Sequence, residues 1–314
     1  MIRLVGVELT RLRWRRAVLI LVALGVALTA VVFVGVVVDS RSRTIEQVAA
    51  DNGPQVLEEV ARCVDHPRQY GQPKDAEDLQ TRCEDTILGY YGVNELNLRE
   101  QREAGSGPAL VALLAVILLL AGTTFVGHDW NTGSMSNQLL FEPRRLRVWA
   151  AKAVAVTAVT GTLTVLVLAA YWTGLWAFAS ARGAPIGEHA VEAAYKQVVL
   201  GTAFVAGAAL LGYALTMLLR TTVGSLGLLL GTAFLGIVVV WTGWGGAESL
   251  MPWTNFVAFV VGGYDYYTSG SCNGYDCESL THHIGRADSS VYFAVVLLVV
   301  VAASMLSFRR RDVP

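Results

Sequence analysis

Six long runs of uncharged, mostly apolar residues constrain this 314-residue chain more than any other feature. They cover residues 17–38, 108–127, 153–181, 197–219, 221–247 and 289–308. A helix of about 20 apolar residues crosses a hydrocarbon core of roughly 30 Å, and every run reaches that length. None shows the two-residue alternation of a membrane β-barrel. The sequence therefore predicts an all-α polytopic membrane protein with six transmembrane helices.

Composition agrees with that class and excludes others. The chain is 54% hydrophobic and 16% charged, whereas soluble domains carry about 25% charged residues. This excludes an ordinary soluble enzyme, a disordered chain and a nucleic-acid-binding domain, so we expect a lipid bilayer and no nucleic acid as surroundings. The basic residues are almost all arginine, which is typical of a GC-rich bacterial genome and predicts the bacterial inner membrane.

The distribution of charge predicts the orientation of the chain. With six crossings, segments 1–16, 128–152 and 309–314 together with Arg220 hold 13 positive and four negative charges. The segments 39–107, 182–196 and 248–288 hold 11 positive and 21 negative charges. Because basic residues are retained on the cytoplasmic side, both termini are predicted to be cytoplasmic. A further apolar run, 249–264, is too short to cross, and we expect it to form part of a re-entrant hairpin within the outer loop 248–288.

All four cysteines lie in the two large loops that this topology places outside the cytoplasm, where disulfides persist. Local pairing favours Cys63–Cys83 and Cys272–Cys277, although four cysteines allow three connectivities. In loop 39–107, segments 54–64 and 75–88 have apolar residues at helical spacing, and a bridge would join them. The loop is interpreted as a small structural cap, or alternatively as a platform for a substrate or partner. A zinc site of Cys272 and Cys277 with His282 and His283 has unsuitable spacing, so no metal is predicted.

The N-terminal segment 1–16 is predicted to form an amphipathic helix. Ile2, Val5, Leu9 and Leu12 share one helical face and have arginines beside them. This pattern is typical of a helix at the cytoplasmic membrane interface; the alternative is that the arginines only set the topology.

The cytoplasmic segment 128–152, between the second and third spans, has a second such pattern. Met135, Leu139 and Leu140 form an apolar face, and Pro143 ends the helix. Basic residues follow as the third span begins. A short amphipathic helix of this kind, held by the flanking spans, is suited to contact a cytoplasmic partner.

Motifs for chemistry are absent from the sequence. It has no G-x-x-x-x-G-K-[ST] loop for ATP, no H-E-x-x-H and no G-x-S-x-G. The six predicted spans contain essentially no ionisable side chain, which argues against an ion-coupled transporter or pump. We therefore expect no catalytic residue and no bound cofactor in this chain.

Segment 128–152 is similar to the coupling region of type-2 ABC exporter permeases. Their pattern is an acidic residue, Gly-[Thr/Ser], Leu-Leu-x-x-Pro, arginine and lysine. The matching positions here are Asp129, Gly133, Ser134, Leu139, Leu140, Pro143, Arg144, Arg145 and Lys152. The amphipathic start with Glu8, the basic C-terminus and the apolar hairpin before the last span extend the resemblance over the whole topology. The first outer loop is longer than in compact members that export lipid or polysaccharide.

This resemblance implies the membrane-spanning subunit of a bacterial ABC exporter. It would pair with a second permease subunit, identical or homologous, and with two ATPase subunits that bind ATP and Mg²⁺. The residues implied to couple the permease to the ATPase are Asp129, Trp130, Gly133, Ser134, Met135, Leu139, Leu140, Pro143, Arg144 and Arg145. An uncharged pathway predicts an apolar or amphipathic cargo, such as a drug, lipid or peptide.

Two other classes of protein are considered. One is a membrane sensor or assembly factor whose outer loop binds a ligand and whose cytoplasmic loop binds a signalling partner. The other is a membrane-embedded enzyme acting on lipid, with His282 and His283, or His128 and Asp129, as catalytic groups.

Overall fold

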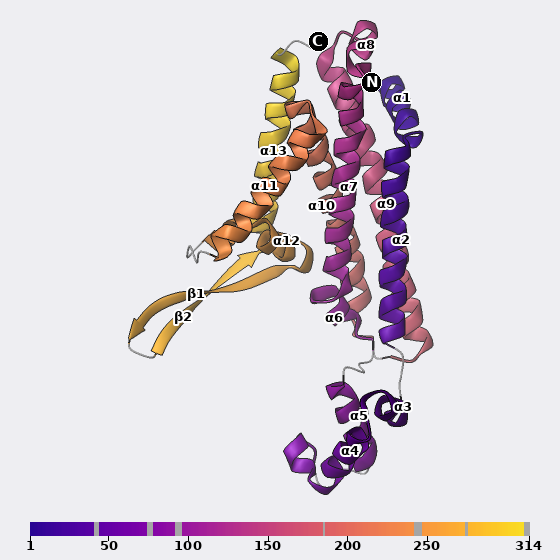
Figure 1. Ribbon diagram of the computed structural model, residues 1–314, viewed down its shortest axis with the longest axis vertical. Coiled ribbons are helices and arrows are strands. Elements are labelled where there is room, and N and C mark those ends of the chain that lie inside the picture. The colour runs from indigo at the N-terminus through magenta and orange to yellow at the C-terminus, as the bar shows by residue number, and fades with distance from the viewer. Residues whose placement is uncertain are drawn as a thin grey trace.

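Five long apolar helices run along the long axis of the molecule (Figure 1). They are α2 (Arg16–Asp39), α7 (Ser106–Asn131), α9 (Arg145–Ala181), α10 (Ala190–Leu219) and α13 (Arg286–Arg310). All five are long and apolar enough to cross a membrane, because about 20 residues at 1.5 Å per residue span 30 Å. This confirms a helical, multi-pass membrane protein.

The computed structural model describes residues 1–40, 44–73, 78–91, 96–184, 186–241, 247–273 and 276–310. Within these ranges the side chains of residues 239–241, 247–248, 268–273 and 276–279 are left out. The short helix α1 (Ile2–Arg13) and the end of α13 lie at one end of the bundle, together with α8 (Ser134–Phe141). We call this the α8 end, and the opposite end, where α6 (Leu98–Glu103) lies, the α6 end.

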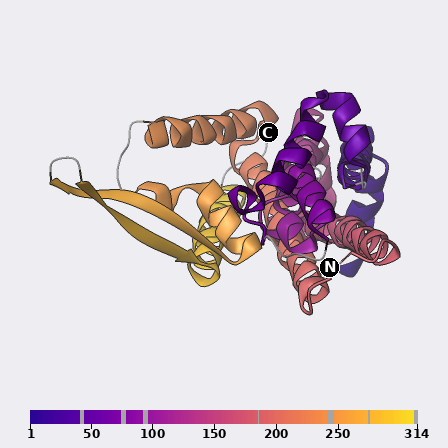
Figure 2. The ribbon, with the colours of Figure 1, turned by 90° about the horizontal axis from the view of Figure 1, so that it is seen from below.

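The sixth predicted span, 221–247, contains α11 (Thr222–Trp241). Its fully described part, Thr222–Val238, is shorter than the other five apolar helices. α11 begins near the end of α10 and runs back toward the opposite end of the bundle, standing apart from the other helices (Figures 1 and 2). Most of its side chains are exposed in this chain.

Close packing of α7 on α10 forms the centre of the bundle. A Cβ atom added at Gly212 of α10 would lie 2.5 Å from the carbonyl oxygen of Leu119 on α7. One added at Gly122 of α7 would overlap the carbonyl oxygen of Ala209 on α10. Glycine at these positions lets the two backbones touch, which is how small residues promote helix association in membranes.

A separate small helical unit lies beyond the α6 end. It consists of α3 (Ile45–Asn52), α4 (Gln55–Asp65), the 3₁₀ helix η1 (Pro67–Tyr70) and α5 (Leu79–Tyr90). Val48, Val56 and Ile87 form its apolar core. The predicted Cys63–Cys83 disulfide is confirmed, and both cysteines are buried between α4 and α5. The core is too small to be stable alone by the usual scaling of burial with size, so the disulfide is an essential part of it.

Loss of this disulfide is expected to unfold the small unit while leaving the bundle intact. A crosslink that closes a loop of about 20 residues contributes about 3 kcal/mol. We expect a Cys63→Ala/Cys83→Ala variant to be cleaved within residues 44–91 at least tenfold faster than wild type in limited proteolysis. The bundle should remain protected in the same sample. Equal cleavage rates in that region would show that the core alone holds the unit.

The segment before α13 departs from the all-helical prediction. The 3₁₀ helix η2 (Ala247–Leu250) and α12 (Pro252–Val261) are followed by two antiparallel strands, β1 (Gly263–Asn273) and β2 (Asp276–Gly285). Most of the predicted apolar run 249–264 therefore forms the short helix α12, and β1 and β2 occupy most of the described residues that follow it in loop 248–288. Its register places Cys272 opposite Cys277; the predicted bridge between their side chains lies outside the described residues.

Candidate functional site

At the α8 end the chain passes from α7 through the short helix α8 into α9, and it changes direction twice between Thr132 and Arg144. Gly133 adopts a left-handed conformation (φ 67°) that ends α7 and begins α8. Pro143 separates α8 from α9, because a proline cannot continue the hydrogen-bonded ladder. α1 lies against α9 at this end (Figure 1). The ends of α1, α7, α8 and α9 therefore converge.

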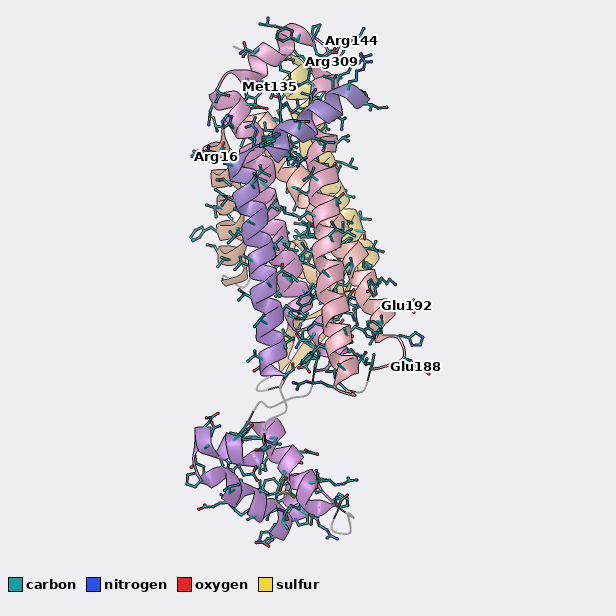
Figure 3. All side chains as sticks on the ribbon, turned by 90° about the vertical axis from the view of Figure 1, so that its right-hand side faces the viewer. Arg16, Met135, Arg144, Glu188, Glu192 and Arg309 are labelled. Atoms are coloured by element: carbon teal, nitrogen blue, oxygen red, sulfur yellow. A yellow bond between two sulfur atoms is a disulfide. The ribbon has the colours of Figure 1, made fainter. Side chains whose placement is uncertain are left out.

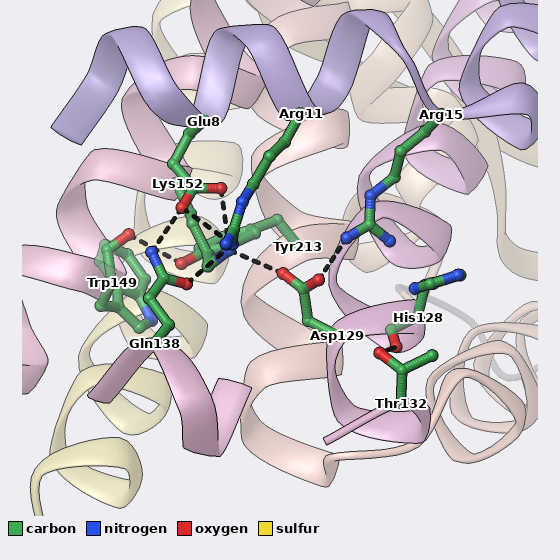
Figure 4. A network of polar contacts seen from close by, with 10 residues as sticks. All are labelled: Glu8, Arg11, Arg15, His128, Asp129, Thr132, Gln138, Trp149, Lys152 and Tyr213. Atoms are coloured by element: carbon green, nitrogen blue, oxygen red, sulfur yellow. Dashed lines mark hydrogen bonds and ion pairs between the residues drawn. The ribbon is translucent and has the colours of Figure 1, made fainter. Parts of the chain in front are cut away.

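A buried charge cluster lies where these helices converge (Figure 4). The Nζ of Lys152 on α9 is 2.8 Å from Oε2 of Glu8 on α1 and 2.6 Å from Oδ2 of Asp129 on α7. All three side chains have no exposed surface. One ammonium group thus joins two carboxylates that come from different helices.

Further polar groups complete the cluster. Arg15, at the α1–α2 junction, pairs with Oδ1 of Asp129. The Nε2 of Gln138 on α8 donates to Oε1 of Glu8 at 2.5 Å, and Nη1 of Arg11 lies 3.7 Å from the same oxygen. We use the term charge cluster for Glu8, Arg15, Asp129 and Lys152, in which two positive and two negative charges balance.

Aromatic side chains enclose the charge cluster on the bundle side. The ring of Phe125 lies 5.1 Å from the guanidinium carbon of Arg15 and 5.3 Å from Nζ of Lys152, within the range of cation–π attraction. Tyr213 of α10 donates to the carbonyl oxygen of Trp149 at 2.7 Å. The cluster therefore sits at the top of the packed core, shielded from water on that side.

The charges of the cluster lie just outside the apolar runs that were predicted to hold essentially no ionisable side chain. That prediction ended the second run at residue 127 and began the third at 153. In the structure α7 continues to Asn131 and α9 begins at Arg145, so Asp129 and Lys152 are inside the helices and buried. An apolar run ends at the first charged residue, but the helix itself continues past that residue when a neighbouring helix supplies a partner of opposite charge.

The predicted coupling residues fall into an inner and an outer group. Asp129 and Met135 are fully buried, and half-buried Leu139 packs against the main core. Trp130 is half-buried with its ring against Phe308. Met135 and Leu139 therefore hold α8 on the bundle, while Asp129 and Trp130 of α7 contact α9 and α13.

The outer group forms an exposed apolar tip. Leu140 is 80% exposed and Phe141 is 91% exposed, at the end of α8. Pro143, Arg144 and Arg147 follow and are exposed, whereas Arg145 donates to the carbonyl oxygen of Phe308. We call Leu140, Phe141, Arg144 and Arg147 the α8 tip. Of the predicted residues, Gly133 and Ser134 only set where α8 begins.

Sequence reasoning named neither Glu8 nor Lys152 as a coupling residue, although both were noted in the resemblance. It also missed Gln138 and Arg15. A signal was present for Glu8, because it lies on the same helical face of α1 as Leu12, which is 5% exposed. Ile2, predicted on that face, is instead 89% exposed. The apolar face of α1 is therefore partly turned toward α9 and not only toward a membrane surface.

The two ends of the bundle differ in charge. The labelled Arg16, Arg144 and Arg309 lie at the α8 end, and Glu188 and Glu192 lie at the α6 end (Figure 3). This is the asymmetry that positive-inside topology requires if the α8 end is cytoplasmic.

The histidines considered in the enzyme hypothesis lie apart from any cluster of metal ligands within the described ranges. The Nδ1 of His283 is 2.6 Å from Oδ1 of Asp265 on the exposed hairpin. His128 is exposed, whereas Asp129 beside it points into the charge cluster (Figure 4). These two residues therefore do not form a dyad.

One comparison with known proteins gives a match. The family model described as "Protein of unknown function (DUF2705)" matches residues 106–314, about two thirds of the chain. No curated protein and no solved structure matches. The matched region begins at α7 and includes α8 and α9, and therefore Asp129, Lys152 and the α8 tip.

Proposed function

The chain belongs to the DUF2705 family, and we propose that it is the membrane-spanning subunit of a bacterial ABC-type exporter. The observation that carries the proposal is the α8 tip. Leu140 and Phe141 are large apolar side chains held almost fully in solvent, next to Arg144 and Arg147. An exposed apolar pair with a charged rim is typical of a protein-binding site.

In this proposal the α8 tip binds a separate ATPase subunit, which holds ATP and Mg²⁺. Movement of that subunit on nucleotide binding would push α8. Because α8 is tied to Glu8 through Gln138, and Glu8 to α9 through Lys152, the push would reach α1, α7 and α9 together. The charge cluster is then the part that transmits movement to the spans.

The proposed topology has six crossings, with both termini and the α8 end in the cytoplasm of the bacterial inner membrane. α10 ends at the α8 end and α13 begins near the α6 end (Figure 1), so the chain must return between them. α11 is the helix that supports a sixth crossing. A second permease subunit, identical or homologous, would complete the transport pathway, with an apolar or amphipathic cargo.

An aspartate in the α8 tip is expected to release the ATPase subunit. We expect Leu140→Asp to lower the amount of co-purified ATPase, and vanadate-sensitive ATP hydrolysis, at least tenfold, because a buried apolar contact would be replaced by a charge without a partner. The matched control is Tyr90→Asp on α5, since Tyr90 is also 80% exposed but lies at the other end. The measurement is affinity purification from native membranes in mild detergent.

The same purification tests the main alternative, a membrane sensor or assembly factor. The observation that favours a sensor is the separate, disulfide-linked unit α3–α5, which could bind a ligand. If the wild-type chain purifies alone, or with a signalling protein and without ATPase activity, the exporter proposal is wrong. If ATPase co-purifies equally with Leu140→Asp, the α8 tip is not its binding site.

A further inference from the structure

An apolar groove of about 550 Å³ lies between α7, α10, α12 and α13. Aromatic rings dominate its wall: Phe204 of α10, Trp253, Phe256 and Phe259 of α12, and Phe293 of α13. Small and aliphatic residues of the same four helices form most of the rest, and Ser290 is the one polar side chain among the described residues that line it. The volume is in the usual range of small-molecule sites, roughly 300–1,000 Å³.

The helices that line the groove indicate its depth in the membrane. Three of them, α7, α10 and α13, are helices long and apolar enough to span a membrane. The lining residues of α13 are near its start, between Ser290 and Leu297. Near that end, Trp253 packs on Tyr264 at 5.1 Å and Tyr292 donates to the carbonyl oxygen of Leu250. Aromatic side chains with polar tips are enriched at the membrane–water interface, so the groove extends from one interface into the hydrocarbon.

The chemistry of the wall selects the occupant. Water would find almost no hydrogen-bond partner in this groove, and an empty groove would forfeit the van der Waals contacts of its aromatic rings. An acyl chain is apolar, narrow and flexible, and it is the main component of the bilayer at this depth.

A positive charge lies where the head of such a lipid would be. The guanidinium of Arg286 donates to the carbonyl oxygens of Phe259 and Val261 at 3.2 and 3.3 Å, at the end of α12. It is thereby fixed beside the groove-lining Phe259. Arg102 also donates to Val261 but is paired with Glu103. Arg286 thus places a cation at the depth of lipid phosphates, which complements their charge.

We propose that this groove binds one acyl chain of a membrane phospholipid, with its phosphate near Arg286. The bound chain completes the packing between the α12–α13 pair and the α7–α10 pair. This site is independent of any ATPase partner, because it depends only on the helices lying in a bilayer.

Photo-crosslinking in vesicles tests the site. The probe is phosphatidylcholine with a diazirine in one acyl chain, and labelled positions are found by peptide mass spectrometry. The protein is transferred to mild detergent and washed before irradiation, so that only tightly held lipid can react. We then expect label in the groove segments 112–119, 203–211 and 290–297. The exposed face of α2, which includes Ile20 (67% exposed) and Val31 (65% exposed), should lose its label at least tenfold, since loosely held lipid exchanges away.

A variant that fills the groove provides the decisive comparison. Gly207 lines the groove, and a Cβ there meets its nearest neighbour, Leu297, at an ordinary 3.9 Å. We expect Gly207→Phe to lower retained groove labelling at least tenfold. Gly227→Phe on α11 is the control, because a Cβ at Gly227 meets nothing within 4 Å. Ala203→Phe, also in the groove wall, serves as a second filling variant if Gly207→Phe does not fold.

Three results would overturn the proposal. The first is loss of groove labelling from the wild-type protein as fast as labelling on α2. The second is unchanged labelling in the folded filling variants. The third is a dimer in which the groove segments crosslink to a second copy instead of to lipid. The same experiment with a phosphatidylglycerol probe tests the position of the phosphate. If Arg286→Gln retains as much groove label as wild type, the phosphate does not lie near Arg286, while the acyl-chain site itself still stands.

Discussion

Replacing Lys152 with methionine is expected to destabilise the purified protein by about 3–5 kcal/mol, the usual result of removing one partner from a buried ion pair. The substitution keeps an unbranched side chain of similar length, so packing changes little. It removes the cation that joins the buried carboxylates of Glu8 and Asp129, and leaves Asp129 paired with Arg15 and Glu8 with only the partly exposed Arg11 at 3.7 Å. Thermal and denaturant unfolding in detergent measure the loss. Lys196→Met is the matched control, because Lys196 is exposed on α10 and its substitution should change stability by less than about 0.5 kcal/mol.

A second substitution separates charge from packing. In Glu8→Gln/Lys152→Met the buried charges that remain are Asp129 and Arg15, which neutralise one another. Replacing both members of a buried ion pair by uncharged groups is often neutral for stability, so the double variant should recover most of the loss. A double variant as unstable as Lys152→Met would show that Lys152 acts through packing.

The double variant also tests the proposed transmission of movement. It should fold and bind the ATPase subunit through an intact α8 tip, yet ATP hydrolysis should no longer respond to cargo, because the link from Glu8 to Lys152 is gone. A stable double variant with normal transport would remove the charge cluster from the mechanism while leaving the α8 tip in place.

The cluster shows where sequence reasoning stops in this chain. Long apolar runs predicted the helices that form the bundle, since apolar length is what a bilayer requires. The positions of Asp129 and Lys152 beside those runs suggested interface charges. Only packing in space shows that Glu8, 144 residues before Lys152 in the chain, pairs with it, and that Lys152 also pairs with Asp129.

The β-hairpin was missed for a different reason. Tyr264–Thr268 is rich in aromatic and β-branched residues, and the dipeptide Asn273-Gly274 is a strong hairpin signal. These local signals were present, but the prediction considered only the apolar run 249–264 and assigned no strands to the rest of the loop. By contrast, the Cys63–Cys83 bridge was predicted correctly because it joins two short amphipathic helices that have little core without it.

Gly212→Leu is expected to prevent assembly of the bundle. Ala208-x-x-x-Gly212 has the spacing of small residues that lets helices approach closely in membranes, and in the structure the helix that approaches Gly212 is α7. A side chain at Gly212 would meet the carbonyl oxygen of Leu119, and a backbone atom cannot rotate away as a side chain can. Overpacking of a core usually costs about 1–3 kcal/mol; here the helices must separate, so we expect a larger loss.

The measurement is the yield of monodisperse protein after extraction in mild detergent, together with its unfolding temperature. We expect the yield of Gly212→Leu to fall at least tenfold. Gly227→Leu places the same side chain in another apolar helix, where a Cβ has nothing within 4 Å, and should match wild type. Gly212→Ala adds only the overlapping Cβ, so its yield and unfolding temperature should lie between those of Gly212→Leu and Gly227→Leu. Normal folding of Gly212→Leu would mean that α7 and α10 can pack at a greater separation. Close contact between these two helices would then not be what positions the charge cluster and the groove wall.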